Sequence, residues 1–421
     1  MISSGNKPPD KHRDVLFGSA PGADFAASDF KVIDLVSDPR ISAGDKEGTF
    51  PCNKPLVPTL RSWNGQQIAV SRGRTLAPVR KALDFVEVNG IIFRPGMSAE
   101  LVNDGMIRIA EISQDACGNI LVRGRHLAKL KDLPASFPRW DRELCWVTKV
   151  KSDGSVDDKE IPITWMRSIV RVHFTNDPWS RFYSPHQPGQ GTYFCRLRWM
   201  RIEDSTELYI RYLRADEADE GYSVPSSVLR RRWRGETRLF GSSGPDTNRK
   251  YTFGDGFCGA GGISCGARMA GLDVKWSFDH NEAATRTYRM NFPETICELA
   301  DFDQFMTNSA EDIRVDVSHS SPPCQTWSPA HTVASADDDR NSALIFSSYN
   351  LILKVRPRIH TLEQTSGLPE RYKEEYHWVI RDTLELGYSV HAKVVRADEY
   401  GVPQRRKRLI FIAAGSVGRD G

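Results

Sequence analysis

A cysteine, Cys324, stands directly behind two prolines in the segment HSSPPCQTWSP, residues 319–329. Proline fixes its own φ and pushes the residue before it toward extended geometry, so the chain enters Cys324 with few conformations to choose from. A thiol held in one direction suits nucleophilic catalysis, because a thiolate attacks carbon well at neutral pH and can leave again. The alternative is a turn whose cysteine only packs, as buried free cysteines commonly do.

A glycine-rich loop lies in the segment FGDGFCGAGG, residues 253–262. Its glycines let the backbone turn sharply and approach a ligand, and a helix from about Ile263 would present free N–H groups there. Gly254, Gly256 and Gly259 match the dinucleotide fingerprint G-x-G-x-x-G, and Asp279 follows at about the distance of a ribose-binding acid. S-adenosylmethionine (SAM) also fits, since it offers a ribose diol for Asp279 and an adenine for groups near Asp301. A loop that only packs strand against helix is the alternative.

Elements that would position these residues follow from residue 251 onward. Strand-like segments lie at 251–257, 273–279, 296–302, 315–321, 357–364, 389–395 and 408–414. Helical segments between them include 282–292, 342–355 and 375–387. Strands and helices in alternation predict an α/β fold with a mainly parallel, Rossmann-like sheet covered on both faces. Ligands of such sheets bind at the carboxyl ends of the strands, where both the glycine loop and Cys324 are expected.

The preceding residues have a different organisation. Short β-rich runs separated by turn residues extend over 56–215 and predict a compact all-β domain. They lie at 82–93, 105–115, 119–128, 142–150, 163–174, 191–200 and 205–213. Residues 1–55, rich in Gly, Pro, Ser and Asp, are expected to be a disordered tail, and residues 216–250 a basic linker before the α/β domain of 251–421.

Composition sets the broad class of the protein. A chain of 421 residues with 39% hydrophobic and 26% charged residues predicts a soluble protein of two or three domains. The first residues lack the apolar core of a secretory signal, and no stretch approaches the ~18 to 20 apolar residues that span a bilayer, so an intracellular protein is expected. The eight cysteines never form a C-x-x-C pair, so neither a zinc module nor a disulfide framework is indicated.

The net charge of +3 is small, but basic residues are clustered. Residues 230–250 carry seven Arg or Lys against two acids, and residues 404–408 add four more. Either cluster can be a solvated face or part of a nucleic-acid contact.

Four segments, DGFCGAGG, SSPPCQTWSP, LEQT and GVPQRRKR, resemble motifs of the cytosine-5 DNA methyltransferase family in order and spacing over about 160 residues. The resemblance implies SAM as cofactor and a flipped cytosine of duplex DNA as substrate. The implied cofactor-binding residues are Phe257, Cys258, Gly259, Gly261, Gly262, Asp279, His280, Asp301 and Pro323. The implied catalytic residues are the nucleophile Cys324, then Glu363 at cytosine N3, and Arg406 and Arg408; Gln325 and Gln404 are implied to contact the substrate.

The chemistry explains these residue types. Carbon 5 of cytosine is a poor nucleophile until a thiolate adds at C6, after which C5 can attack the methyl sulfonium. Glu363 can share a proton with N3, and Arg406 and Arg408 can lower the thiol pKa, clamp the base, or both. The residues do not identify the base that removes the C5 proton. Trp327 is expected to pack rather than to stack on a base, and its place also excludes the P-C-x-x-C signature of zinc deaminases.

Three features qualify the resemblance. The triplet Glu363-Gln364-Thr365 replaces the usual Glu-Asn-Val and resembles the fungal branch linked to repeat-induced point mutation and premeiotic methylation. Segments such as IRIAEISQD and TYFCRLRW resemble a bromo-adjacent homology (BAH) domain, which implies a chromatin or histone partner and a nuclear location; a β module that only braces the catalytic domain is the alternative. The sequence ends at Gly421, before the place where the family has its target-recognition domain and two further motifs.

Three other functions remain open at this point. A cytosine-5 RNA methyltransferase would share the motifs, and a catalytically weak chromatin-binding protein would keep the fold. A nicotinamide-dependent oxidoreductase would explain only the glycine loop and would leave PPCQ and QRRKR without a role.

Overall fold

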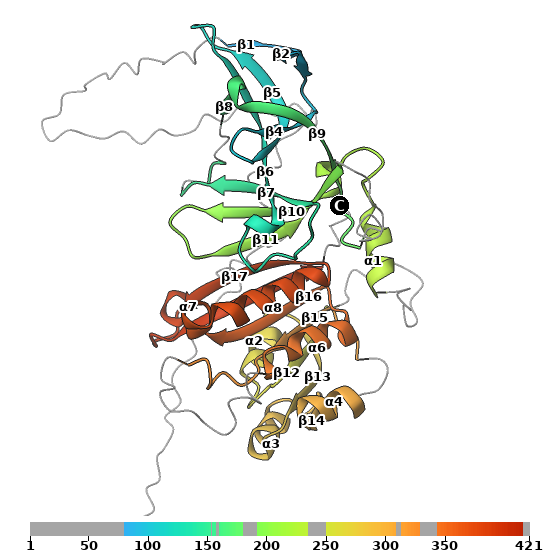
Figure 1. The fold of residues 1–421 in the computed structure, drawn as a ribbon. Coiled ribbons are helices and arrows are strands. Elements are labelled where there is room, and N and C mark those ends of the chain that lie inside the picture. The colour runs from blue at the N-terminus through green and yellow to red at the C-terminus, as the bar shows by residue number, and fades with distance from the viewer. Residues whose placement is uncertain are drawn as a thin grey trace, which may run out of the picture. The chain divides into compact units, whose positions relative to one another are not determined.

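The structure, a computed structural model, describes residues 80–152, 154–156, 160–179, 192–234, 250–308, 313–328 and 343–415 (Figure 1). The tail predicted for residues 1–55 lies outside these ranges, as do the first residues of the predicted all-β domain. No helix within these ranges is long and apolar enough to cross a membrane.

The C-terminal part is an α/β fold around a mainly parallel sheet, as predicted. Its strands are β12 Thr252–Gly256, β13 Asp273–Asp279, β14 Ile296–Leu299, β15 Val317–Ser320, β16 Ile359–Thr365, β17 Tyr388–Arg396 and β18 Lys407–Gly415. They lie in the order β14-β13-β12-β15-β16-β18-β17. Strand β18 runs antiparallel to both of its neighbours, while the pairings from β14 to β16 are parallel.

Helices follow most of these strands. They are α2 Gly262–Met269, α3 Glu282–Asn291, α4 Phe302–Asn308, α6 Ser347–Val355, α7 Gly367–Arg371 and α8 Lys373–Glu385. Each pairs a buried side with an exposed one, as an amphipathic helix on a sheet must. The parallel strands therefore end at one edge of the sheet, and the loops after β12, β13, β14 and β15 meet there.

The described part of residues 80–212 is built from strands and short 3₁₀ turns. The strands are β1 Lys81–Ala82, β2 Val86–Val88, β3 Ile91–Phe93, β4 Ser98–Leu101, β5 Met106–Gln114, β6 Ile120–Lys129, β7 Glu143–Val150, β8 Glu160–Pro162, β9 Met166–Phe174, β10 Thr192–Ile202 and β11 Leu208–Tyr212. The 3₁₀ turns are η1 Leu130–Asp132 and η2 Ile163–Trp165. Strand β11 pairs antiparallel with β17 at Leu208–Ile210, so hydrogen bonds connect the two sets of strands.

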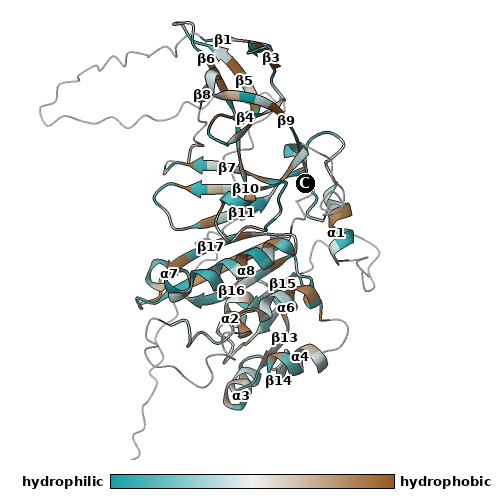
Figure 2. Cartoon of the chain, viewed as in Figure 1, coloured by the Kyte–Doolittle hydropathy of each residue, from teal (hydrophilic) through white to brown (hydrophobic). Residues whose placement is uncertain are grey.

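A helix lies within the stretch that the sequence predicts as a basic linker. Helix α1 Ser226–Arg234 carries hydrophobic and hydrophilic residues (Figure 2), and it buries Leu229 and Trp233. The Trp233 ring stacks on Trp179 at 5.7 Å, and its Nε1 donates a hydrogen bond of 2.8 Å to the hydroxyl of Tyr388 on β17. This part of the linker is therefore packed against the C-terminal sheet, while residues 235–249 lie outside the described ranges.

Candidate active site

The glycine loop connects β12 to α2 through three left-handed residues, Phe257, Gly259 and Gly261. Phe257 has φ of 57°, a conformation that costs a non-glycine residue free energy and is common at functional sites. Gly261 has φ of 97°, and a Cβ there would stand 2.5 Å from the Phe292 ring. Glycine is therefore required at 261 for two independent reasons, one conformational and one steric.

Asp279, the predicted ribose-binding acid, holds this loop in place. One carboxylate oxygen accepts a hydrogen bond of 2.9 Å from the backbone N–H of Gly259, and the other accepts one of 2.8 Å from Asn281. The carboxylate is largely buried at the end of β13. The loop and the acid thus form one hydrogen-bonded unit.

A second buried acid, Asp255, holds the same loop through hydrogen bonds. Asp255 of β12 accepts hydrogen bonds from the backbone N–H of Ser264 at 3.1 Å and from its hydroxyl at 2.6 Å. Burial raises the pKa of Asp255 to about 7 despite these two hydrogen bonds. Its other carboxylate oxygen has no hydrogen-bond partner among the described residues.

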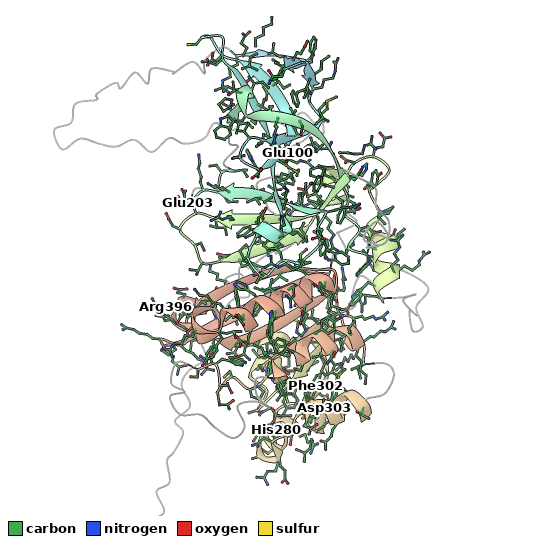
Figure 3. The ribbon with its side chains drawn as sticks, viewed as in Figure 1. Glu100, Glu203, His280, Phe302, Asp303 and Arg396 are labelled. Atoms are coloured by element: carbon green, nitrogen blue, oxygen red, sulfur yellow. The ribbon has the colours of Figure 1, made fainter. Side chains whose placement is uncertain are left out.

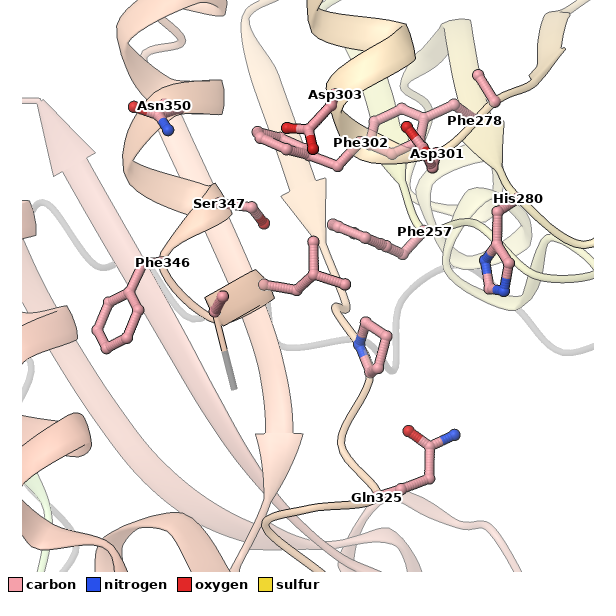
Figure 4. Close-up of a pocket in the computed structure, with 14 residues that line it drawn as sticks. Phe257, Phe278, His280, Asp301, Phe302, Asp303, Gln325, Phe346, Ser347 and Asn350 are labelled. Atoms are coloured by element: carbon pink, nitrogen blue, oxygen red, sulfur yellow. The ribbon is translucent and has the colours of Figure 1, made fainter. Parts of the chain in front are cut away.

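A pocket of about 480 Å³ opens where the loops after β12, β13, β14 and β15 meet (Figure 4). Among the predicted residues, its lining includes Phe257, His280, Asp301, Pro323 and Gln325. Figure 3 shows His280, Phe302 and Asp303 in one region of the C-terminal part. Four neighbouring loops therefore contribute to one cavity, of a size typical for small-molecule and cofactor sites.

Other predicted residues lie behind the pocket wall. Gly259, Gly261, Gly262 and Asp279 shape the loop but are not on the lining. Cys258 is buried against Tyr288, Phe292 and Cys297, so its side chain belongs to the core beneath the loop. Cys258 thus supports the loop by packing, and its backbone N–H donates to the Phe278 carbonyl at 3.0 Å.

Several pocket residues were not predicted from the sequence. Phe302 and Asp303 belong to α4, and Phe346, Ser347 and Asn350 come from α6 or directly before it. Phe302 lies parallel to the Phe257 ring, with ring centres 6.2 Å apart. The spacing of Phe346, Ser347 and Asn350 on one helix face was visible in the sequence, but nothing in it shows that this face lines a cavity.

Two residues after Glu363 hold the loop that carries Cys324. Gln364 is fully buried and its Nε2 donates a hydrogen bond of 3.0 Å to the Pro322 carbonyl. The Thr365 hydroxyl donates one of 2.9 Å to the Trp327 carbonyl. Trp327 is 3% exposed and packs edge-on against Tyr372, which confirms that it packs. The triplet that departs from the usual motif therefore fixes both sides of Cys324.

Charged groups gather around the thiol. Glu363 and Arg408 form an ion pair, with Arg408 Nε 2.5 Å from Glu363 Oε1, and Arg406 lies 3.9 Å from the same oxygen. Cys324 is half-buried and interacts electrostatically with all three. Gln404 lies in the exposed turn before β18, where its carbonyl accepts a hydrogen bond of 2.9 Å from the Arg406 backbone.

Pocket and thiol are immediate neighbours. Pro323 and Gln325 line the pocket, and Cys324 between them belongs to the charged group of Glu363, Arg406 and Arg408. The short loop after β15 thus separates a cofactor-sized cavity from a thiol with a carboxylate and two guanidinium groups. This arrangement suits the transfer of a group from a bound cofactor to a second substrate held at the thiol.

Comparison with known proteins identifies the segment that carries this site. Residues 251–416 match the C-5 cytosine-specific DNA methylase family. We refer to them below as the methylase segment. The chain is 32% identical over 178 residues to the type II methyltransferase M.AgeI of Thalassovita gelatinovora, a match that covers 39% of this chain and 40% of that protein. It is 33% identical over 175 residues to M1.HphI of Haemophilus parahaemolyticus, with 40% of this chain and 46% of that protein covered.

The chain spans less than half the length of these curated relatives. Among solved structures, the S. pombe Dnmt2 methyltransferase aligns with a TM-score of 0.32 and 17% identity over 41% of this chain and 51% of that one. SAM is the methyl donor of C-5 cytosine methyltransferases. SAM is therefore the cofactor whose binding to the pocket of the methylase segment should be tested.

In the methylase segment, the pKa of the Cys324 thiol lies above its ordinary value. Burial raises its pKa, and the neighbouring Glu363 carboxylate raises it further. Arg408 and Arg406 lower the pKa, as the sequence predicts, but burial and Glu363 outweigh them. The thiolate of Cys324 therefore forms less readily here than that of a free cysteine.

Proposed function

We propose that this chain carries the catalytic part of a SAM-dependent DNA (cytosine-5)-methyltransferase. The observation that supports the proposal most strongly is the loop after β15. Its Pro323 and Gln325 line the cofactor-sized pocket, while Cys324 stands beside Glu363 and Arg408. The match of residues 251–416 to the C-5 cytosine methylase family supports the same reaction.

The pocket fits SAM in its chemistry. Phe257 and Phe302 offer aromatic faces for a base, and Asp301 and His280 supply polar groups beside them. Asp279 lies directly before His280, which is on the lining, and is proposed to bind the ribose. When bound, SAM would supply an electrophilic methyl group, and Pro323 and Gln325 are among the residues that would hold it.

The residues of the chain then perform the steps that cytosine requires. A flipped cytosine between Cys324 and Glu363 receives the thiolate at C6, which forms an S–C bond and moves the C5–C6 π electrons onto C5. Glu363 shares a proton with N3 and offsets the charge that develops there. C5 takes the methyl group from the sulfonium sulfur, which keeps the bonding electrons and leaves as the thioether of S-adenosylhomocysteine. A base then removes the C5 proton, and the electrons of that C–H bond re-form the C5–C6 double bond as the Cys324–C6 bond breaks.

Arg406 and Arg408 have two roles in this scheme. They offset the negative charge of the attacking thiolate, and Arg408 holds the Glu363 carboxylate in a fixed position through the ion pair. The side chain of Arg406 is half-exposed, so it is available to contact the target base or its phosphate. The exposed turn that contains Gln404 lies beside them and is proposed to contact the substrate.

The remaining features extend the proposal. The triplet Glu363-Gln364-Thr365 supports a place in the fungal branch named above, and the strands between residues 80 and 212 are compatible with a BAH-like module. We propose for this module a histone or other chromatin partner, and for the protein a location in the nucleus. Binding of the module to a panel of histone peptides tests the first of these assignments, and a fluorescent fusion tests the second.

The decisive experiment measures methyl transfer from labelled SAM to unmethylated DNA, hemimethylated DNA and transfer RNA, with Cys324→Ser beside the unmodified protein. Transfer to DNA that disappears in the variant is the expected result. Transfer that persists in Cys324→Ser would exclude the proposed nucleophile. Transfer to transfer RNA alone would replace DNA by RNA as the substrate, and SAM binding without any transfer would favour the catalytically weak chromatin-binding protein.

A further inference from the structure

A buried hydroxyl without a partner lies on the wall of the pocket. Ser347 is the first residue of α6 and is 4% exposed. Its Oγ makes no hydrogen bond to any residue that the structure describes. A buried hydroxyl in this state destabilises the fold, so its position calls for a partner that the described residues do not supply.

The next residue of α6 shows the contrast. Ser348 is also buried, but its hydroxyl lies 2.6 Å from that of Ser320, which is 3.3 Å from Nε2 of His360. Ser348 is not on the pocket lining, whereas the side chain of Ser347 projects toward the interior of the pocket (Figure 4). Of these two hydroxyls of α6, that of Ser348 therefore lies in the core and that of Ser347 lies at the cavity.

The position of Ser347 within the pocket indicates which part of a ligand it would meet. His280, which follows the proposed ribose-binding Asp279, lies at the opposite side of the pocket from Ser347 (Figure 4). Phe257 lies between them in this view, and Phe302 and Leu344 are also on the lining (Figure 4). A nucleoside with its ribose near Asp279 would extend its base across these apolar side chains, with the polar edge of the base toward α6.

We propose that the Ser347 hydroxyl hydrogen-bonds to the polar edge of the adenine when SAM or its product binds. Ser347 is then a cofactor-positioning residue that the four sequence motifs do not contain. The inference rests on the proposed function, because it takes an adenine nucleoside as the ligand. Asp303 and Asn350 lie on the same lining and add polar groups beside the hydroxyl.

Calorimetric titration with S-adenosylhomocysteine and with adenosine tests the assignment, using the full chain and the variants Ser347→Ala and Ser348→Ala. Loss of one neutral hydrogen bond should raise the Kd of Ser347→Ala about three- to tenfold for both ligands. The melting temperature of ligand-free Ser347→Ala should equal or exceed that of the unmodified protein, because the variant removes a hydroxyl without a partner. Ser348→Ala should do the reverse, with a lower melting temperature and an unchanged Kd.

Two results would overturn the assignment. One is an unchanged Kd for both ligands in Ser347→Ala, and the other is a weaker affinity for S-adenosylhomocysteine with no change for adenosine. A protein that binds both ligands through Ser347 but transfers no methyl group would keep the assignment and refute the proposed function. If the unmodified protein binds neither ligand, the assignment of Ser347 and the proposed function are both refuted.

Discussion

Arg408 Nε lies 2.5 Å from Oε1 of Glu363, and this ion pair stands beside the thiol of Cys324. The two partners act on the thiol with opposite sign: Glu363 raises the Cys324 pKa and Arg408 lowers it. Attack on cytosine requires the thiolate, so the two charges, together with burial, determine how readily Cys324 reacts. A proton on Glu363, as when it is shared with cytosine N3, would remove the opposing charge at the moment of attack.

The first prediction concerns the pH at which Cys324 reacts. Glu363→Gln should move the alkylation of Cys324 by iodoacetamide to lower pH, because a negative neighbour is lost. Arg408→Gln should move it to higher pH, because a positive neighbour is lost. Peptide mass spectrometry can follow Cys324 separately, with the exposed Cys117 in the same samples as a control that should not change. A shift in the opposite direction in either variant would contradict the proposed electrostatic balance.

The second prediction concerns the hydrogen bond from Thr365 to the Trp327 carbonyl, which is 2.9 Å long and buried. Thr365→Val keeps the shape but leaves that carbonyl without its donor, so we expect a loss of about 1–3 kcal/mol in the free energy of unfolding. The Cys324 loop should also lose its fixed direction, which lowers kcat.

Thr383→Val is the matched control for this variant. Thr383 donates 2.7 Å to the Val379 carbonyl within α8, in a helix whose carbonyls already have backbone partners. The substitution Thr383→Val should therefore have little effect on stability or kcat. Equal losses of kcat in the two variants would show that Thr365 has no special part in positioning Cys324.

The sequence predicts local features of this molecule, such as strands, better than contacts between residues that are distant in sequence. The strands of the C-terminal sheet were predictable because apolar runs bounded by turn residues are local signals, and the parallel order follows from alternation with helices. The neighbourhood of Cys324, Glu363 and Arg408 came from motif resemblance, since these residues are far apart along the chain. The outcome of their competing effects on the thiol was not predictable, because burial dominates the Cys324 pKa.

Helix α1 and Ser347 escaped prediction for a related reason. Arginine dominates α1, and its buried residues are Leu229 and Trp233, four residues apart. Their burial depends on partners such as Tyr388 that are distant in sequence. Likewise, a serine at the start of a helix is ordinary in sequence, and only the assembled pocket shows that the hydroxyl of Ser347 has no partner among the described residues. Both features exist only through tertiary contacts.

The third prediction uses the buried Asp255. Its folded pKa of about 7 lies above the ordinary value of 3.8, so the folded state holds a proton that the unfolded state releases. Stability should therefore fall as the pH rises from about 4 to about 7, with a slope of at most ~1.4 kcal/mol per pH unit. Asp255→Asn should remove this component of the pH dependence, measured by thermal unfolding at several pH values. Asp132→Asn, at an exposed site, should keep it.

The last prediction concerns the contact between Gly387 and Trp179. Gly387, directly before β17, has φ of 89°, and a Cβ there would stand 2.5 Å from the Trp179 ring. Trp179 in turn stacks on Trp233 of α1, so a displaced ring would disturb the packing of α1 on the sheet. Gly387→Ala should therefore be destabilising through both backbone strain and overpacking, by about 2–5 kcal/mol in the free energy of unfolding.

Gly221→Ala separates these two contributions. Gly221 has nearly the same φ, 82°, but its Cβ would meet nothing within 4 Å, so only the strain of about 1–2 kcal/mol applies. Chemical denaturation of both variants measures the difference. If Gly387→Ala costs no more than Gly221→Ala, the Trp179 ring can move freely, and the packing of α1 against the C-terminal sheet does not depend on it. A larger cost that disappears in the double variant Trp179→Ala, Gly387→Ala would assign the excess to this one contact.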